Sequence, residues 1–72
     1  MKPKVKLNGE RLKEARRLRR LTQVELGDLI LMSNATVRNY EKGRTCTTMV
    51  KVQALAIALE VRAAWLLGGS HE

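Results

Sequence analysis

The chain has 72 residues, enough for one small domain whose single core is only marginally sufficient. Its 14 Lys and Arg residues against 7 Asp and Glu give a formal net charge of +7, which favours a polyanionic partner over a merely solvated basic surface. The single cysteine excludes an internal disulfide, Cys46 and His71 are too few for a metal site, and no apolar run approaches the ~20 residues that span a bilayer. With no signal-peptide pattern, we expect a cytoplasmic protein with no cofactor and no membrane partner.

The N-terminal residues 1–7 are expected to form a flexible basic arm, because lysines alternate with other residues around Pro3. Such an arm can follow a DNA backbone, although a simple disordered terminus is the commoner explanation. Asn8 is then a suitable N-cap for a helix over residues 9–19. Its apolar stripe is Leu12, Ala15 and Leu18.

Two short helices follow, over residues 23–30 and 34–42, joined by only a few residues. Thr22 and Ser33 precede them as N-caps, and Glu25 completes a capping box with Thr22. Two capped helices with a tight connection are typical of a helix-turn-helix, whose second helix reads DNA. A glycine inside the first helix costs about 1 kcal/mol relative to alanine, which is tolerable where another backbone passes closely.

The second of these helices has an outward face suited to DNA. Val37 and Tyr40 are expected to point inward, as are Leu26, Leu29 and Ile30 of the first helix. The residues left outside are Asn34, Ala35, Arg38 and Asn39. Amides and an arginine read base edges in a major groove, and an ordinary solvated helix face is the alternative.

The rest of the chain predicts two more helices and no strand. Gly43 suits the left-handed position after the preceding helix, and residues 43–48 form a loop containing Cys46, a passive loop residue or a redox-sensitive thiol. Thr47 or Thr48 caps a helix over residues 49–59, whose apolar residues are Val52, Leu55, Ala56 and Leu59. A short helix over residues 62–67 precedes a flexible tail, residues 68–72. We therefore expect an all-α fold.

These residues together resemble the Cro/C1-type (XRE-like) helix-turn-helix family, in particular the DNA-binding domains of lambdoid-phage repressors and the Cro proteins. The likeness covers residues 12–67 and is carried by Leu21-Thr22-Gln23, Glu25-Leu26, Ser33, Thr36-Val37, Tyr40-Glu41-Lys42-Gly43, Leu55-Ala56, Ala58-Leu59, Val61 and Trp65-Leu66-Leu67. It implies a compact, lambda-repressor-like five-helix bundle over residues 8–67 that binds operator DNA as a two-fold dimer.

The resemblance also implies roles for single residues. Base-reading positions correspond to Asn34, Ala35 and Asn39, and Arg38 on the same side would take a guanine or a phosphate. Phosphate-binding positions correspond to Gln23, Thr36, Lys42, Arg44 and Lys51. Arg16 and Glu41 match an interior ion pair. The expected dimer contacts are Trp65 and Leu66, although plain core filling is an equal alternative for Trp65.

Three residues depart from the family pattern. Arg20, Leu31 and Glu60 stand where a glycine or asparagine is common at a helix end. A left-handed residue other than glycine costs about 1–2 kcal/mol, so either the turns carry this cost or their geometry differs. Leu31 matters most, because it lies in the turn that sets the angle of the reading helix.

The function expected is sequence-specific regulation of transcription through double-stranded DNA. A phage-type repressor or Cro-like dimer would occlude a promoter by placing two reading helices about 34 Å apart on a pseudo-palindromic operator. The alternative is an antitoxin or another protein-interaction module with autoregulatory DNA binding. We expect neither an enzyme nor a small-molecule substrate, because no acid–base pair and no nucleophile with a partner are visible.

Overall fold

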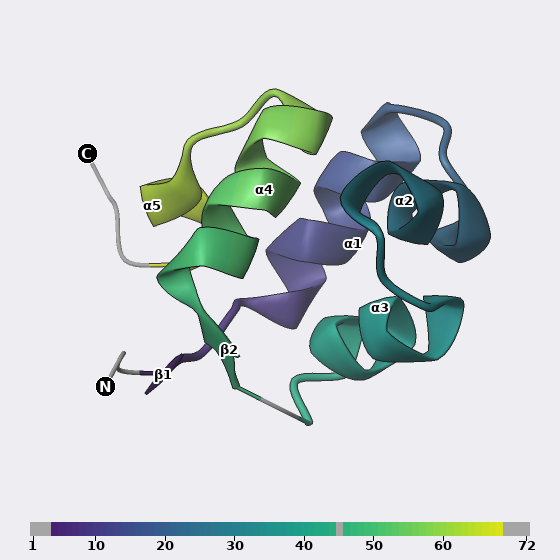
Figure 1. Cartoon of the computed structure of the whole chain (residues 1–72). Helices are drawn as coiled ribbons and strands as arrows, with labels where there is room; N and C mark the ends of the chain where they lie inside the picture. Colours follow the sequence, from purple (N-terminus) through teal and green to yellow (C-terminus); the bar gives the residue numbers. More distant parts are fainter. Residues whose placement is uncertain (1–3, 45, 69–72) are drawn as a thin grey trace.

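The computed structural model describes residues 4–44 and 46–68 of the chain. In chain order the elements are β1 (Lys4–Val5), α1 (Gly9–Leu18), α2 (Gln23–Ile30), α3 (Asn34–Glu41), β2 (Thr47–Thr48), α4 (Met49–Leu59) and α5 (Ala63–Leu66). Helix α1 lies in the centre, with α2 and α3 on one side and α4 and α5 on the other (Figure 1). The expected compact bundle of five helices is confirmed, and each helix end lies within one residue of its prediction. None of these helices is both long and apolar enough to cross a membrane.

A small antiparallel sheet joins the N-terminus to the segment before α4, which corrects the expectation of a fold without strands. In this sheet Lys4 pairs with Thr48 and Val5 with Thr47. Strands of two residues are too short for an alternating pattern to be recognised in the sequence. Leu7, which follows β1, is buried in the core. Residues 4–7 are therefore part of the fold rather than of a flexible arm, and residues 1–3 and 69–72 lie outside the described part.

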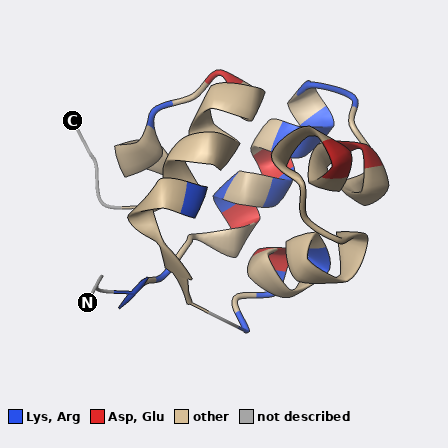
Figure 2. Cartoon of the chain, in the orientation of Figure 1, with Lys and Arg blue, Asp and Glu red and all other residues tan. Residues whose placement is uncertain are grey.

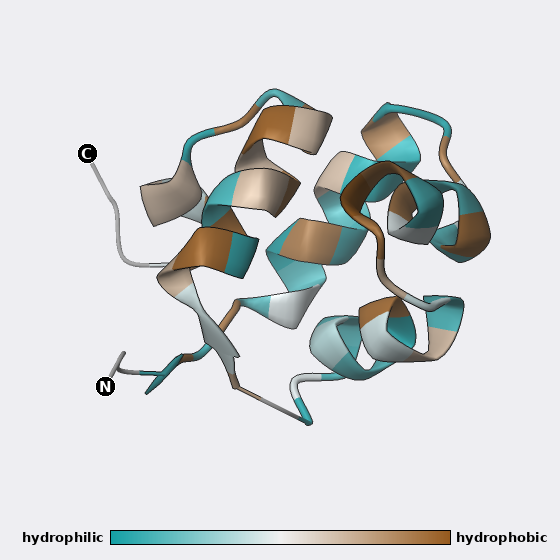
Figure 3. Cartoon of the chain, in the orientation of Figure 1, coloured by the Kyte–Doolittle hydropathy of each residue, from teal (hydrophilic) through white to brown (hydrophobic). Residues whose placement is uncertain are grey.

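The core is made of aliphatic side chains and one tyrosine. Its buried members are Leu7, Leu12, Ala15, Leu26, Val37, Tyr40, Val52, Leu55, Ala56, Leu59 and Leu66. Hydrophobic and hydrophilic segments alternate along α1, α3 and α4, as expected of helices that bury one face (Figure 3). The Tyr40 hydroxyl donates a hydrogen bond of 3.0 Å to Oγ1 of the buried Thr47. This bond fastens the end of α3 to β2.

Two residues predicted for the core are exposed instead, namely Leu18 and Leu29. Each step of three residues falls about 60° short of a full helical turn, so Leu18 lies about 120° around α1 from Leu12. Likewise, the inward side of α2 passes through Leu26, Gly27 and Ile30, and Leu29 falls to one side of that arc. Spacing alone identifies a helix but does not fix which edge of its stripe is covered.

The predicted N-caps are all present. The four side chains each accept a hydrogen bond from the backbone N–H three residues later, and they are Asn8, Thr22, Ser33 and Thr48. The carboxylate of Glu25 in turn accepts from the backbone N–H of Thr22, which completes the predicted capping box. These bonds satisfy N–H groups that otherwise lack a partner at the start of each helix.

The C-terminal ends of α1 to α4 share one turn geometry. One or two residues after each helix end, one residue has a positive φ, and the N–H of the residue that follows it donates to a carbonyl oxygen five residues earlier. The four left-handed residues are Arg20, Leu31, Gly43 and Glu60. Arg20, Leu31 and Glu60 therefore adopt the same left-handed conformation as Gly43. Each of the three turns includes the conformational cost of a side chain in that region.

Gly27 is required by the turn between α2 and α3. A Cβ atom added to this residue would lie 2.4 Å from the carbonyl oxygen of Met32, which belongs to the backbone and cannot move aside. The close backbone is thus that of the turn itself, not that of a crossing helix. Glycine here lets α3 approach α2 closely.

Candidate nucleic-acid interface

Helix α3 presents a polar face to solvent. Val37 and Tyr40 are buried, which fixes the rotation of the helix about its axis. Of the residues on the opposite side, Asn34, Ala35 and Arg38 are exposed and Asn39 is half-buried. The structure therefore places the four residues expected to read bases on the outer side of one helix.

The first turn of α3 is held by its cap. The backbone N–H of Thr36 donates to the Ser33 hydroxyl at 3.2 Å, and the two hydroxyl groups lie 3.0 Å apart within hydrogen-bonding distance. Thr36 is half-buried, so its hydroxyl is less accessible than the side chains on either side of it. A phosphate that reached Thr36 would have to share this hydroxyl with Ser33.

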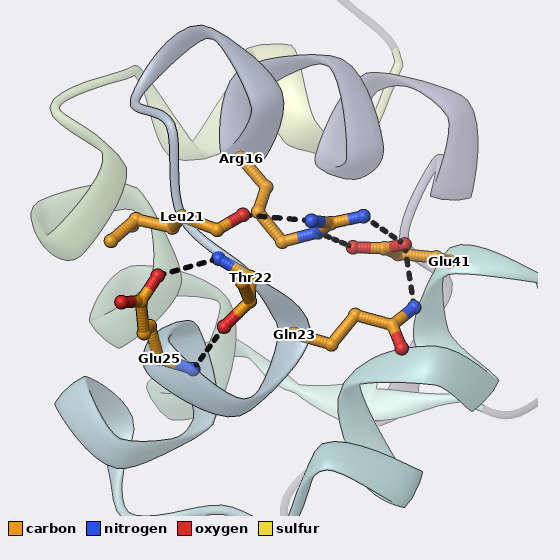
Figure 4. Close-up of polar contacts among 6 residues, drawn as sticks. All are labelled: Arg16, Leu21, Thr22, Gln23, Glu25 and Glu41. Atoms are coloured by element: carbon orange, nitrogen blue, oxygen red, sulfur yellow. Dashed lines mark hydrogen bonds and ion pairs between the residues drawn. The ribbon is translucent and has the colours of Figure 1, made fainter.

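A buried polar network ties α3 to α1 and α2 (Figure 4). Nε of Arg16 donates to Glu41 at 2.5 Å and Nη2 donates at 3.2 Å, which gives a two-point ion pair. The side-chain amide of Gln23 donates to the same carboxylate at 3.1 Å, and Nη1 of Arg16 donates to the carbonyl oxygen of Leu21 at 2.8 Å. We call Arg16, Gln23 and Glu41 the buried network. It fixes the end of α3 relative to the start of α2.

Basic residues lie on the segments next to α3, whereas the charged residues of α2 are all acidic (Figure 2). Lys42 and Arg44 are exposed immediately after α3, and Lys51 is exposed in the first turn of α4. Gln23 stands at the start of α2, where the dipole and unpaired N–H groups of the helix favour an anion. These residues lie on the segments that flank the polar face of α3.

The two residues expected at the dimer interface, Trp65 and Leu66, differ in how deeply they are buried. Leu66 is fully buried, so the prediction that it contacts a second copy is wrong. Trp65 is half-buried, and the guanidinium carbon of Arg11 lies 5.2 Å from the centre of its ring. Arg11 also donates to the carbonyl oxygen of Trp65 at 2.9 Å. Trp65 thus fastens α5 to α1, a contact between distant positions that no local spacing could reveal.

Arg19 and Glu60 form a second link between helix ends. Nη2 of Arg19 lies 2.9 Å from the Glu60 carboxylate, and Nε donates to the carbonyl oxygen of Leu59 at 3.1 Å. Both side chains are substantially exposed, so the ion pair itself contributes little to stability. The hydrogen bond from Arg19 to the Leu59 carbonyl oxygen nevertheless joins the end of α1 to the end of α4.

The comparisons with known proteins agree with this geometry. The helix-turn-helix family model HTH_3 matches residues 12–66 of the chain. The P22 c2 repressor, in a crystal structure with a synthetic operator, is 29% identical over 92% of this chain and all of that one, with a TM-score of 0.82. The restriction-modification controller protein C.AhdI from Aeromonas hydrophila is 31% identical over 81% of this chain and 88% of its own, with a TM-score of 0.76.

A third structure, the biofilm master regulator SinR in complex with DNA, shares the fold with a TM-score of 0.76 at 20% identity, covering 82% of this chain and 95% of its own. Of these three proteins, the P22 c2 repressor and SinR are in complex with an operator and with DNA, and C.AhdI is a controller protein. The family model covers well over half of the sequence, which confirms the expected resemblance. The chain belongs to the helix-turn-helix (HTH_3, XRE-like) family of DNA-binding transcription regulators.

Proposed function

We propose that this protein is a repressor of the phage type, which binds an operator sequence through α3 and blocks access to a promoter. The observation that carries the proposal is the polar face of α3, held at a fixed angle by the buried network. The similarity to the P22 c2 repressor, which was crystallised with operator DNA, supports it. The net charge of +7 supports a polyanionic partner as well.

Different side chains of α3 suit different bases. The amides of Asn34 and Asn39 donate and accept together, which suits the N6 and N7 atoms of adenine in the major groove. Ala35 offers only a methyl group, which suits contact with the methyl group of thymine. A site rich in adenine and thymine therefore fits this helix better than a site rich in guanine.

Contacts to the DNA backbone supply affinity and set the register. Lys42, Arg44 and Lys51 are exposed cations on the segments that follow α3, and they attract phosphates without distinguishing bases. Gln23 and Thr36 lie in the first turns of α2 and α3, where backbone N–H groups face an approaching phosphate. Together these contacts make binding strongly dependent on salt.

We further propose that two copies pair on the operator through α4. Val50 and Ile57 are 57% and 78% exposed and lie seven residues apart, so they point to the same side of the helix. In an antiparallel pairing centred between Gln53 and Ala54, Val50 of each copy meets Ile57 of the other, as a two-fold interface requires. Two such contacts bury far less than the ~1,200 Å² of a stable interface, so the dimer forms on DNA rather than in free solution.

Selection from a random pool of duplex DNA at low salt tests this proposal. We expect an enriched sequence with two-fold symmetry and half-sites about one helical turn apart. The double variant N34A/N39A should lose the preference for that sequence while keeping non-specific binding. R62A, which changes an exposed side chain outside α3 and α4, serves as the control. The absence of any enriched symmetric sequence would refute operator binding.

A separate measurement tests the dimer surface. We expect the charged variant V50E/I57E to bind a single half-site as the unaltered protein does, but to lose cooperative binding to the full operator. Equal cooperativity in the two proteins would place the dimer contact elsewhere. Sedimentation of the free protein should show a monomer.

A further inference from the structure

A groove of about 440 Å³ is formed between α1 and α3 and reaches the first residue of α2. We call it the α1–α3 groove. Its lining residues are Glu10, Lys13, Arg16, Arg17, Gln23, Arg38, Glu41 and Lys42. Five of these side chains are basic and two are acidic, so the walls carry a net charge of +3. A concave surface of this sign concentrates anions.

Four of the basic side chains in this groove have no acceptor among the residues that the structure describes. Arg16 is bound to Glu41 in the buried network, and these two charges offset each other. Within residues 4–44 and 46–68, the remaining four form neither an ion pair nor a side-chain hydrogen bond, and they are Lys13, Arg17, Arg38 and Lys42. Glu10 is the one other acid that lines the groove. These four cations are therefore available to bind an anion from outside the protein.

The start of α2 adds backbone donors at one end of the groove. The capping box uses the N–H groups of Thr22 and Glu25. The N–H groups of Gln23 and Val24 have no acceptor among the described residues. The positive end of the helix dipole lies at the same place. Unpaired N–H groups beside several cations form a site suited to phosphate oxygens.

We infer that the α1–α3 groove binds phosphodiester groups of the DNA backbone, so that α1 is a DNA-contacting helix through Lys13 and Arg17. This inference rests on the proposed function and deepens it. It also assigns Arg38 to the backbone rather than to a base, because Arg38 lines the groove whereas Asn34, Ala35 and Asn39 do not. A DNA strand carries a negative charge every ~3.4 Å along the helix axis, so a groove lined by several cations can contact more than one phosphate.

The dependence of affinity on salt tests the groove. Each lost phosphate contact lowers the slope of log K against log salt concentration by about 0.9. We expect K13A, R17A and R38A each to lower the slope by about this amount and to weaken binding equally on all sequences. Arg62 is exposed, lies outside the groove and makes no cap hydrogen bond, so R62A is the matched control and should leave the slope unchanged.

The sequence selected by each variant separates the two roles of Arg38. If R38A selects the same operator as the unaltered protein, Arg38 contacts the backbone; a changed base preference at one position would overturn its assignment. Slopes for K13A and R17A that match R62A would overturn the contact with α1. Competition by inorganic phosphate at fixed ionic strength would show a site for free phosphate instead, and we expect none.

These outcomes are distinct from failure of the proposed function. If the unaltered protein selects no symmetric sequence, operator binding itself is refuted. If it selects one and the groove variants behave like R62A, only the inference about the groove fails. Circular dichroism of each variant checks folding, which we expect to be intact because Arg17 and Arg38 are exposed and Lys13 is only half-buried.

Discussion

Replacing Arg16 by methionine (R16M) should destabilise the fold by about 3–5 kcal/mol, because it leaves a buried carboxylate without its counter-ion. The side chains of Arg16 and Glu41 are only 11% and 4% exposed. Arg16 donates two of the three side-chain hydrogen bonds that the Glu41 carboxylate accepts from described residues, so that only the bond from Gln23 would remain. Methionine fills much of the same space, and the loss is therefore mainly electrostatic.

Urea unfolding followed by circular dichroism measures this loss. At about 0.05–0.15 kcal/mol per residue, a domain of this size has a total stability of roughly 4–11 kcal/mol, so R16M should unfold at a much lower urea concentration. The double variant R16M/E41L removes both charges and should recover most of the stability, because an apolar pair can replace a buried ion pair. A loss below about 1 kcal/mol in R16M, or a double variant no more stable than R16M, would refute this reasoning.

Three further predictions concern backbone and charge. Ala at Gly27 (G27A) should cost more than the gain in helix propensity of about 1 kcal/mol, because its Cβ meets the Met32 carbonyl oxygen; a Tm at or above that of the unaltered protein would contradict this. Ala at Gly43 (G43A) should cost about 1 kcal/mol in urea unfolding through its positive φ alone, since no atom lies within 4 Å of an added Cβ. E10Q should tighten DNA binding more than E14Q does, because Glu10 lines the α1–α3 groove and Glu14 does not; equal affinities of the two variants would contradict an effect of the Glu10 charge.

Local signals in the sequence predicted the helices and their caps correctly. Thr22 with Glu25, and Ser33 before the next helix, act through atoms within a few residues of one another, so the sequence contains the whole interaction. The same holds for the polar face of α3, because Val37 and Tyr40 fix its rotation.

Contacts between distant residues were less accessible from the sequence. The pairing of Lys4 with Thr48 joins segments 44 residues apart through strands too short to show a pattern. The contact of Arg11 with Trp65 likewise depends on how α1 and α5 pack. The sequence shows that Leu66 is apolar, but an apolar residue is equally suited to the core and to an interface with a second copy. Only the packing of the helices shows that Leu66 lies in the core.

The turn at Leu31 shows how the angle of α3 is kept despite an unfavourable residue. Leu31 is 93% exposed and left-handed, so it gains nothing from burial and carries a conformational cost of about 1–2 kcal/mol. Two other features hold the turn: the N–H of Met32 donates to the carbonyl oxygen of Gly27 at 2.8 Å, and the buried network fixes the far end of α3.

Leu31→Gly should therefore raise stability and leave DNA recognition unchanged. Removing the left-handed cost outweighs the greater freedom of glycine in the unfolded chain by up to about 1 kcal/mol, and no packing contact is lost. Urea unfolding measures the first effect, and selection from random duplex DNA measures the second. A changed operator preference in this variant would mean that Leu31 itself helps to aim α3, against the view that the backbone bond and the buried network are sufficient.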